Sequence, residues 1–319
     1  MGSETIRIPI IDFSELKQEG CKSSTLTWES VKNHVKLALE EFGCFEAKFD
    51  QIPKNLRNSV FEALKQLFEL PLENKQRNMS GKPYHGYIGQ AATVPLYESI
   101  GIEHALAPGT IENFTKLLWS DQGNLDFSRS IQAFSEKLSG LDQMIRTMVV
   151  ESLGIEKHID EHLESTDYVV RVQKYDCPQG DEAEIGLVSH TDKNLLSILY
   201  QNEVNALEIM TKDGQWIAAQ SSPNSFIVIV GDAFHAWTNG RLHSAHHRVM
   251  MFGDVVRYSI GLFTVPKDGY IIKAPEDLVD EEHPLLFKPY DHVKFLELFY
   301  SEAGKGMMSP NPLKAYCGA

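Results

Sequence analysis

The segment His190-Thr191-Asp192 places an imidazole and a carboxylate two positions apart, and further histidines follow downstream. Two imidazoles and one carboxylate form the facial triad that binds non-haem Fe(II) and leaves the opposite face of the metal open. The open positions admit a co-substrate and dioxygen. If the segment is a strand, His190 and Asp192 point to the same side and can face one metal ion.

The second histidine of such a triad stays open on spacing alone. A lone histidine on a strand is more often a structural or surface residue than a metal ligand, and the chain has twelve histidines. Strand alternation groups His243 with His247 and turns His246 to the other face. This pattern does not decide between the downstream candidates, which are His235, His243, His246 and His247.

An arginine and a serine follow these histidines at a spacing that suits anion binding. Arg257 and Ser259 are two positions apart, so on a strand both side chains lie on one face. Together they can hold a carboxylate by charge-assisted hydrogen bonds. Without a metal motif upstream, a solvated strand face would explain the pair equally well. Beside a metal site, the pair indicates an oxygenase that uses a keto acid.

Composition and charge narrow the classes of protein. The 319 residues can form one large domain or two smaller ones, and 42% hydrophobic with 23% charged residues is ordinary for a globular enzyme. A net charge of −14 disfavours nucleic acids and anionic membranes as partners. We find no signal-peptide pattern, no apolar run of membrane-spanning length and no CxxC pair. We therefore expect a soluble, cytoplasmic protein with reduced thiols and no obligatory protein partner.

The periodicity of apolar residues changes near residue 165. Before it, apolar spacing predicts three helices, one short edge strand and a loop over residues 77–127. After it, short apolar runs alternate with turn clusters at 212–214 and 238–240, which is typical of a sandwich or barrel. A last amphipathic helix follows over 290–303. The expected helices are Trp28–Phe42, Leu56–Phe68 and Ser130–Leu153; the expected strands are Ile8–Phe13, Tyr168–Val172, Leu195–Leu199, Phe226–Val230 and Tyr258–Val265.

Several of these segments, in their order along the chain, resemble the plant 2-oxoglutarate- and Fe(II)-dependent dioxygenases. The chemical motifs are His-Thr-Asp, then Ser-x-x-His-Arg-Val, then Arg-x-Ser. The similarity covers nearly the whole chain. The other matching landmarks are Ile8–Phe13, Phe42–Phe45, Phe68–Pro71 and Gly231-Asp232.

The resemblance implies a mainly β core with helices, in the α+β class. The core would be a double-stranded β-helix, a jelly roll of the cupin kind, buttressed by N-terminal and C-terminal helices. We expect 1–319 to form a single oxygenase unit. Its parts would be a helical region over 1–160, the double-stranded β-helix with the Fe(II) and 2-oxoglutarate site over 165–270, and a helix and tail over 284–319.

The same resemblance assigns roles to individual residues. It makes His247, directly before Arg-Val, the third metal ligand beside His190 and Asp192. It gives Arg257 and Ser259 the far carboxylate of 2-oxoglutarate. The family's upstream Asn-x-Tyr motif corresponds to Gln173-Lys174-Tyr175, so Tyr175 carries over as a co-substrate residue while Gln replaces Asn. The implied cofactors are Fe(II), 2-oxoglutarate as co-substrate and ascorbate as supporting reductant.

Two further segments are most similar to the subgroup with glucosinolate side-chain, auxin and glycoalkaloid oxygenases: Pro83–Tyr87 and Val94–Ser99. This predicts oxidation of a small specialised metabolite or hormone by O₂, with succinate and CO₂ as co-products. Asp192 favours hydroxylation, because related halogenases carry a small residue there. Phe263, Tyr84 and Tyr87 are candidate substrate contacts, and ordinary core packing explains them about as well.

Three alternatives differ in chemistry. A catalytically silent ligand-binding member of the same fold would need neither the triad nor the Arg-x-Ser pair. A zinc hydrolase would use His and Asp ligands but would leave Arg257 without a role. An oxygenase with ascorbate in place of 2-oxoglutarate would keep the metal site. Substrate-dependent succinate release separates these from a 2-oxoglutarate dioxygenase.

Overall fold

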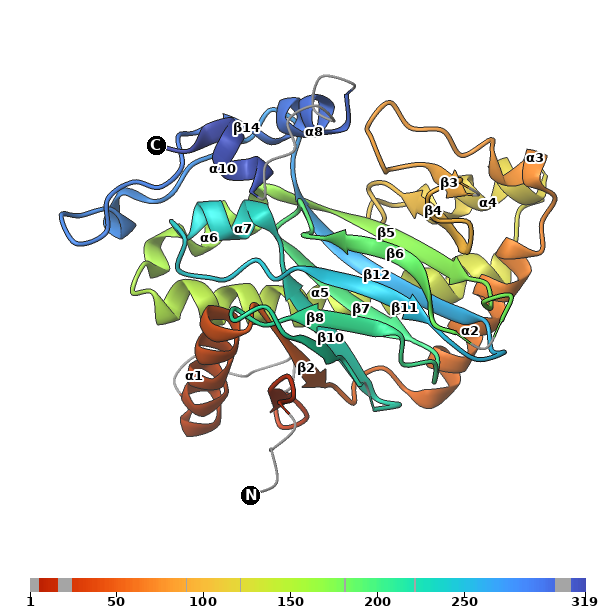
Figure 1. Cartoon of the computed structure of the whole chain (residues 1–319), viewed down its shortest axis with the longest axis horizontal. Helices are drawn as coiled ribbons and strands as arrows, with labels where there is room; N and C mark the ends of the chain where they lie inside the picture. The colour runs from red at the N-terminus through yellow and green to blue at the C-terminus, as the bar shows by residue number, and fades with distance from the viewer. Residues whose placement is uncertain are drawn as a thin grey trace.

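Eight consecutive strands form the centre of the molecule. The structure is a computed structural model, and it describes residues 6–16, 25–89, 91–120, 122–180, 182–220, 222–301 and 311–319. Apart from the adjacent pair β8 and β9, which belong to one sheet, successive strands alternate between two facing sheets, and this makes the core a jelly roll (Figure 1). The jelly-roll strands are β5 (Thr166–Tyr175), β6 (Glu184–His190), β7 (Leu196–Gln201), β8 (Leu207–Met210), β9 (Trp216–Ala218), β10 (Ser225–Val230), β11 (His247–Met251) and β12 (Arg257–Pro266).

The larger sheet contains more than the jelly roll. Its strand order is β1-β2-β10-β7-β12-β5-β4-β3, and the smaller sheet has the order β6-β11-β8-β9. The expected edge strand at the N-terminus is confirmed, because β1 is an end strand of the larger sheet. The added strands are β1 (Ile10–Asp12), β2 (Cys44–Lys48), β3 (Tyr87–Gly89) and β4 (Tyr97–Ile102).

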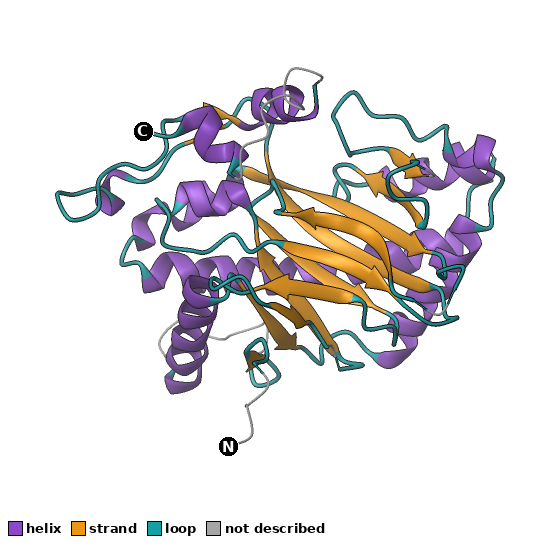
Figure 2. Cartoon of the chain, in the orientation of Figure 1, coloured by secondary structure: helices purple, strands orange, loops and turns teal. Residues whose placement is uncertain are grey.

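Helices cover the outer face of the larger sheet (Figure 2). The longest, α5 (Leu125–Ser152), contacts β7 and β12 and is flanked by α1 (Leu26–Glu41) and α2 (Lys54–Phe68). Side-chain caps start two of them: Thr25 accepts from the amide of Trp28, and Asn124 accepts from that of Phe127. These three helices agree with the sequence predictions to within a few residues.

The strands of the larger sheet separate two apolar layers. On β12, Ile260 and Leu262 pack in the cluster shared with the helices, whereas Phe263 packs in a second cluster inside the jelly roll. The central strand β10 is buried along its whole length, which explains its continuous apolar sequence. The interior cluster is the environment in which a site between the two sheets would be built.

A C-terminal segment lies over one end of the jelly roll. It contains β13 (Ile271–Ile272), β14 (Tyr290–Asp291), α8 (His292–Tyr300) and α10 (Pro312–Cys317). Among the described residues, no helix is long and apolar enough to cross a membrane. The remaining helices are α3 (Leu72–Lys75), α4 (Thr110–Trp119), α6 (Ile159–Glu164) and α7 (Asp232–Trp237), with 3₁₀ turns at Glu156–His158 and Glu276–Leu278.

Several sequence predictions were wrong. Residues 77–127 are not a loop, because they contain β3, β4 and α4. Strand β4 shows no alternation in its sequence since both of its faces are buried. Residues 238–240 form a turn after helix α7 and do not join two strands directly, whereas 212–214 do join β8 to β9. The helix expected over 290–303 begins at His292 as α8, because Tyr290 and Asp291 form β14, and it is not the last helix, because α10 follows it. Residue 303, its expected end, lies outside the described residues.

Candidate metal and keto-acid site

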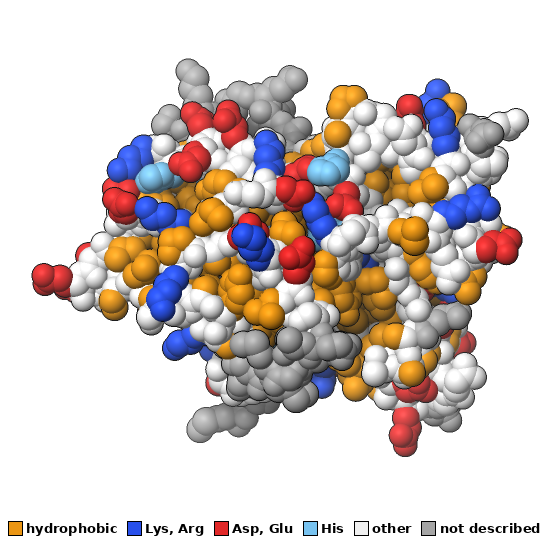
Figure 3. Space-filling model, turned by 90° about the horizontal axis from the view of Figure 1, so that it is seen from above, with side chains coloured by type: hydrophobic (Ala, Val, Ile, Leu, Met, Phe, Trp, Pro, Cys, Tyr) orange, Lys and Arg blue, Asp and Glu red, His pale blue; other side chains and the backbone are white. Residues whose placement is uncertain are grey.

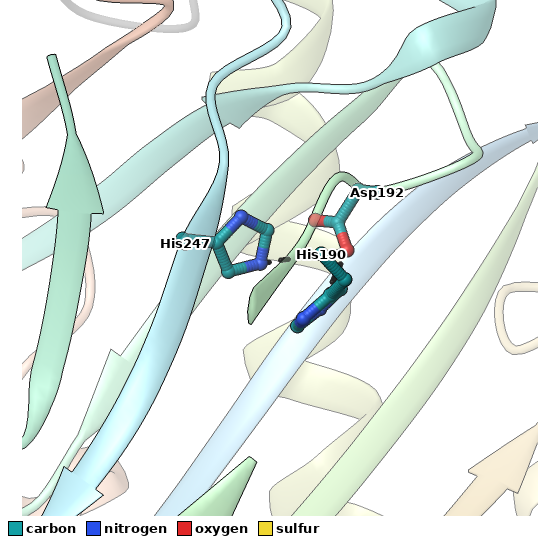
Figure 4. Close-up of side chains that lie close together, drawn as sticks. All are labelled: His190, Asp192 and His247. Carbon is teal, nitrogen blue, oxygen red and sulfur yellow. Dashed lines mark ion pairs between the residues drawn. The ribbon is translucent and has the colours of Figure 1, made fainter. Parts of the chain in front are cut away.

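Three polar side chains converge at the end of the jelly roll (Figure 4). His190 is the last residue of β6, His247 is the first of β11, and the two are paired across the smaller sheet. Asp192 Oδ1 lies 3.8 Å from His190 Nε2 and 3.7 Å from His247 Nε2. One ligand atom from each residue lies within 4.8 Å of the others, so the group can hold one metal ion.

Strand alternation does not produce this cluster. Asp192 lies in the bend that follows β6, and its side chain turns back toward the two rings. His243 precedes β11, so the predicted parity between His243 and His247 does not apply. His246 makes a long contact with Ser189 instead. Of the four downstream candidates, the structure brings only His247 to His190 and Asp192.

The atoms that face away from the cluster have partners. His190 Nδ1 is 2.8 Å from the Val188 carbonyl oxygen, and His247 Nδ1 is 3.3 Å from that of Ala245. Ser197 donates to Asp192 Oδ2 over 2.5 Å. Such contacts orient imidazole and carboxylate ligands and place the lone pairs of both Nε2 atoms toward the metal position. The donor set, two nitrogens and one oxygen, fits Fe(II).

The protonation states also suit metal binding. Burial, followed by the proximity of His247, lowers the pKa of His190 to about 4, so its ring is neutral at pH 7. Burial opposes ionisation of Asp192, but His247, His190 and the Ser197 hydroxyl together lower its pKa below the ordinary value. Asp192 is therefore a carboxylate, and the cluster offers a metal one negative charge.

Asp232 holds the loop that carries Asp192. Its amide donates to the Asp192 carbonyl oxygen over 2.7 Å. Its carboxylate accepts from Lys193 at 2.8 Å, from Thr191 at 3.0 Å and from Ser244 at 2.7 Å. The loop before one histidine and the loop after the other are thus tied to a single buried carboxylate.

A buried arginine lies on the larger sheet, inside the jelly roll. Arg257 is 1% exposed, and Gln201 Oε1 accepts from its Nε at 3.2 Å and its Nη2 at 2.7 Å. Its Nη1 is 3.4 Å from Ser259 Oγ, so the two side chains share a face as predicted. Among the described residues no carboxylate forms an ion pair with this guanidinium, whose charge interacts with the Tyr175 and Tyr97 hydroxyls. A buried cation without a counter-ion suits a ligand carboxylate.

Strand β5 contributes the rest of this group. Tyr175 lies opposite Arg257, with the guanidinium 4.8 Å from its ring centroid, and burial raises the pKa of its hydroxyl. Gln173 lies opposite Ser259 and accepts from its hydroxyl over 2.9 Å. Its amide nitrogen is 3.4 Å from the Tyr97 hydroxyl. The glutamine that replaces the family asparagine is therefore part of the group around Arg257 and Ser259.

The predicted substrate contacts lie in different places. Phe263 lies opposite Ser197, whose hydroxyl binds Asp192, and packs in the interior cluster. Tyr84 precedes β3 and packs against Tyr300 of α8, with 4.4 Å between the centroids of the two tilted rings. Tyr87 packs against the helix-side layer, and its hydroxyl donates to Glu98 over 2.9 Å. Tyr87 thus lies in ordinary core packing, which was the alternative to a substrate contact in the sequence analysis.

Sequence reasoning missed four residues of the site. Gln201 and Ser197 are polar residues in the apolar strand β7, and only their polarity could have marked them. Tyr97 was noted as part of a similar segment without a role. Arg171 on β5 was not noted at all, although an arginine within an apolar strand is a signal of its own.

Two histidines and a carboxylate converge at one end of the jelly roll, and a buried arginine without a counter-ion lies on its inner face. Together these are the features of a non-haem iron oxygenase that binds an organic acid. Comparisons identify the family. Residues 166–266 match the 2OG-Fe(II) oxygenase superfamily, and residues 8–114 match the N-terminal region described for non-haem dioxygenases in morphine synthesis. The chain belongs to the 2-oxoglutarate-dependent dioxygenases and is an enzyme of this class.

Relatives and solved structures agree with this membership. The chain is 49% identical over 308 residues to the probable 2-oxoglutarate-dependent dioxygenase AOP1.2 of Arabidopsis thaliana, covering 95% of this chain and 94% of that protein. The rice dioxygenase for auxin oxidation superposes with a TM-score of 0.80 at 29% identity, covering 98% and 100% of the two chains. A 2-oxoglutarate complex of the Arabidopsis auxin dioxygenase gives 0.77 at 26% identity, covering 87% and 99%.

Proposed function

We propose that this dioxygenase hydroxylates a small plant metabolite or hormone, with succinate and CO₂ as co-products. The observation that carries the proposal is that one jelly roll holds both the convergent His190, Asp192 and His247 and, on its inner face, the buried Arg257. The support for a plant metabolite is the similarity to Arabidopsis relatives and to enzymes named for auxin oxidation. We further propose that residues 1–319 act as a single oxygenase unit.

Each side chain has a defined task in this proposal. His190, His247 and Asp192 would hold Fe(II) through two Nε2 atoms and one carboxylate oxygen. Arg257 and Ser259 would hold the far carboxylate of 2-oxoglutarate by charge-assisted hydrogen bonds. When bound, the iron and the keto acid together supply activation of dioxygen. The protein's own contribution is to fix these ligands before the substrate arrives.

The residues around Arg257 prepare it for an anion. Gln201 binds two guanidinium nitrogens and thereby orients the group, while Tyr175 covers one of its faces. Gln173 accepts from Ser259, which fixes the direction of the serine hydroxyl; rotation of that hydroxyl toward a ligand would exchange this bond for a charge-assisted one. The apolar cluster inside the jelly roll excludes water, which strengthens every ionic contact there.

The test is titration of the purified full chain with Fe(II) and 2-oxoglutarate without oxygen, followed by aerobic measurement of succinate with candidate substrates. The wild type should bind both ligands and release succinate in a substrate-dependent manner. Ascorbate should sustain turnover without replacing 2-oxoglutarate. Binding of both ligands with no succinate for any substrate would favour the catalytically silent alternative.

Two variants and a control sharpen the test. Asp192→Ala removes one of three metal ligands and should abolish succinate formation. Arg257→Gln should weaken 2-oxoglutarate binding about 10- to 100-fold while metal binding persists, because it removes a charge-assisted contact. The control is Asp213→Ala, in the exposed turn between β8 and β9. It removes a negative charge, as Asp192→Ala does, but away from the site, so succinate formation and 2-oxoglutarate binding should stay intact. Full activity of Asp192→Ala would overturn the proposal.

A further inference from the structure

A second buried arginine faces the interior of the jelly roll. Arg171 lies on β5, two and four residues before Gln173 and Tyr175, so strand alternation places its side chain on the face they share. Its partners on the neighbouring strands are both glycines: Gly101 on β4 and Gly261 on β12. No side chain from either flanking position therefore covers the guanidinium.

This guanidinium lacks the partners that a buried charge normally has. Arg171 is 7% exposed, and its Nη1 donates to Ser99 Oγ over 2.6 Å. Its Nη2 is buried without any hydrogen-bond partner. In the described part of the chain, the two acidic residues nearest in sequence to Ser99 form ion pairs with lysines: Glu98 with Lys75, and Glu103 with Lys82. Leaving a buried charged donor unsatisfied is costly, so such a group indicates a missing ligand.

The surroundings of Arg171 connect it to the metal cluster. The hydroxyl of Tyr300, at the end of α8, interacts electrostatically with both Arg171 and Asp192, so it lies within range of both. Tyr84 packs against Tyr300 with tilted rings, which brings the segment before β3 against α8. Figure 3 views the molecule from above Figure 1, the side on which α8 lies, and shows apolar side chains interspersed with acidic and basic ones across that face. Tyr300 is thus within electrostatic range of both the unsatisfied cation and a metal ligand, and Tyr84 packs against it.

We propose that Arg171 binds an oxyanion of the substrate, a carboxylate or a sulfate, and so makes this dioxygenase selective for small organic anions. The proposal rests on the proposed function, because it assigns the group that orients the oxidised molecule. The planar guanidinium offers Nη2, with Nη1 already fixed by Ser99, to an anion whose apolar part lies near Tyr84, Tyr300 and Phe263. Arg257 remains the co-substrate residue, so the two arginines bind two different acids.

The test uses the full chain loaded with Fe(II) and 2-oxoglutarate without oxygen, so that Arg257 is occupied. The probes are indole, phenyl and straight-chain alkyl scaffolds, each offered as a carboxylate, a sulfate ester and a neutral primary amide. Binding is measured by calorimetry. We expect at least one acid or sulfate to bind and its matching amide to bind about 10- to 100-fold more weakly. The preferred anion distinguishes carboxylate from sulfate as the natural group.

Variants separate anion binding from a structural role. Arg171→Gln should lose about the same factor for the acid and little for the amide, whereas Arg171→Lys should retain part of the preference because it keeps the charge. The control Arg57→Gln, on α2, removes an equal charge outside the jelly roll and should change neither the affinity for the acid nor that for the amide. All variants should bind 2-oxoglutarate as the wild type does.

Three results would overturn the role of Arg171: equal binding of acids and amides, no binding by any anion of the panel, or unchanged selectivity in Arg171→Gln. Each applies while 2-oxoglutarate binding is intact. Failure of the wild type to bind 2-oxoglutarate would instead contradict the proposed function, so the two failures are distinguishable.

Discussion

Replacing Asp232 by asparagine tests whether this buried carboxylate holds the metal-binding loop. The side chains of Asp232 and Lys193 are 8% and 9% exposed and 2.8 Å apart, so solvent screens their attraction little. Breaking a buried pair costs about 3–5 kcal/mol when a charge is left alone. Asparagine keeps one acceptor oxygen, which can serve Thr191 or Ser244 but not both, because the two hydroxyls donate to different oxygens of Asp232. We expect the free energy of unfolding to fall by about 3 kcal/mol.

The assay is urea unfolding of the metal-free protein, with an unchanged slope as evidence that the folded and unfolded states are comparable. A double-mutant cycle identifies the cause. Lys193→Met removes the opposite charge, and the double variant should be more stable than the sum of the single losses by about 1–3 kcal/mol. A loss below about 1 kcal/mol in Asp232→Asn, or strict additivity in the cycle, would refute this reasoning.

The same variant should affect the metal site. The Asp232 amide still donates to the Asp192 carbonyl, but the side chain no longer carries the charge that anchors Lys193, which lies next to Asp192 in the loop. Partners of metal ligands typically contribute about 10- to 100-fold in metal affinity. We expect a loss in that range by Fe(II) titration. Unchanged affinity would show that the backbone bond alone positions Asp192.

Three other predictions concern stability. Asp142→Asn should lower the free energy of unfolding by about 3–5 kcal/mol, measured by urea unfolding, because it leaves the fully buried Arg146 without its partner on α5. Burial lowers the pKa of His292 to about 4. In the unfolded chain His292 takes up a proton near pH 6.5, whereas in the folded chain it does so only near pH 4, so the free energy of unfolding is highest above about pH 6.5 and falls as the pH drops toward 4. The loss is about 2 kcal/mol by pH 5. His292→Gln should remove this part of the pH dependence, as measured by urea unfolding at several pH values. A Cβ at Gly231 would lie 2.0 Å from a backbone oxygen, so Gly231→Ala should cost about 3 kcal/mol, whereas Gly180→Ala, in open space, should be neutral.

The site residues that the sequence could predict are those that lie in short local motifs. Arg257 and Ser259 lie on one strand, so alternation was enough to place them on one face. His190 was identified by its neighbour, although Asp192 reaches the metal position from a bend and not from the strand. His247 could not be distinguished from His243 by pattern, because the choice depends on where β11 begins.

The partners of these residues could not be predicted, because they come from strands that are adjacent only in the sheet. Gln201 binds Arg257 since β7 and β12 are neighbours, yet the two residues are far apart in sequence. Ser197 reaches Asp192 from the other end of β7. Their assignment requires the strand order of the larger sheet, which no local pattern contains.

Strand β5 shows why strand order and register matter for the chemistry. It is paired continuously along its length with β12 and, over its C-terminal half, with β4, which fixes its register from both sides. Arg171, Gln173 and Tyr175 follow one another on its inner face. A slip of one residue would turn all three toward the helices at once. The same double pairing therefore keeps Arg171 on one face with the residues around Arg257, so the relative position of the two arginines is set by the register between β5 and β12.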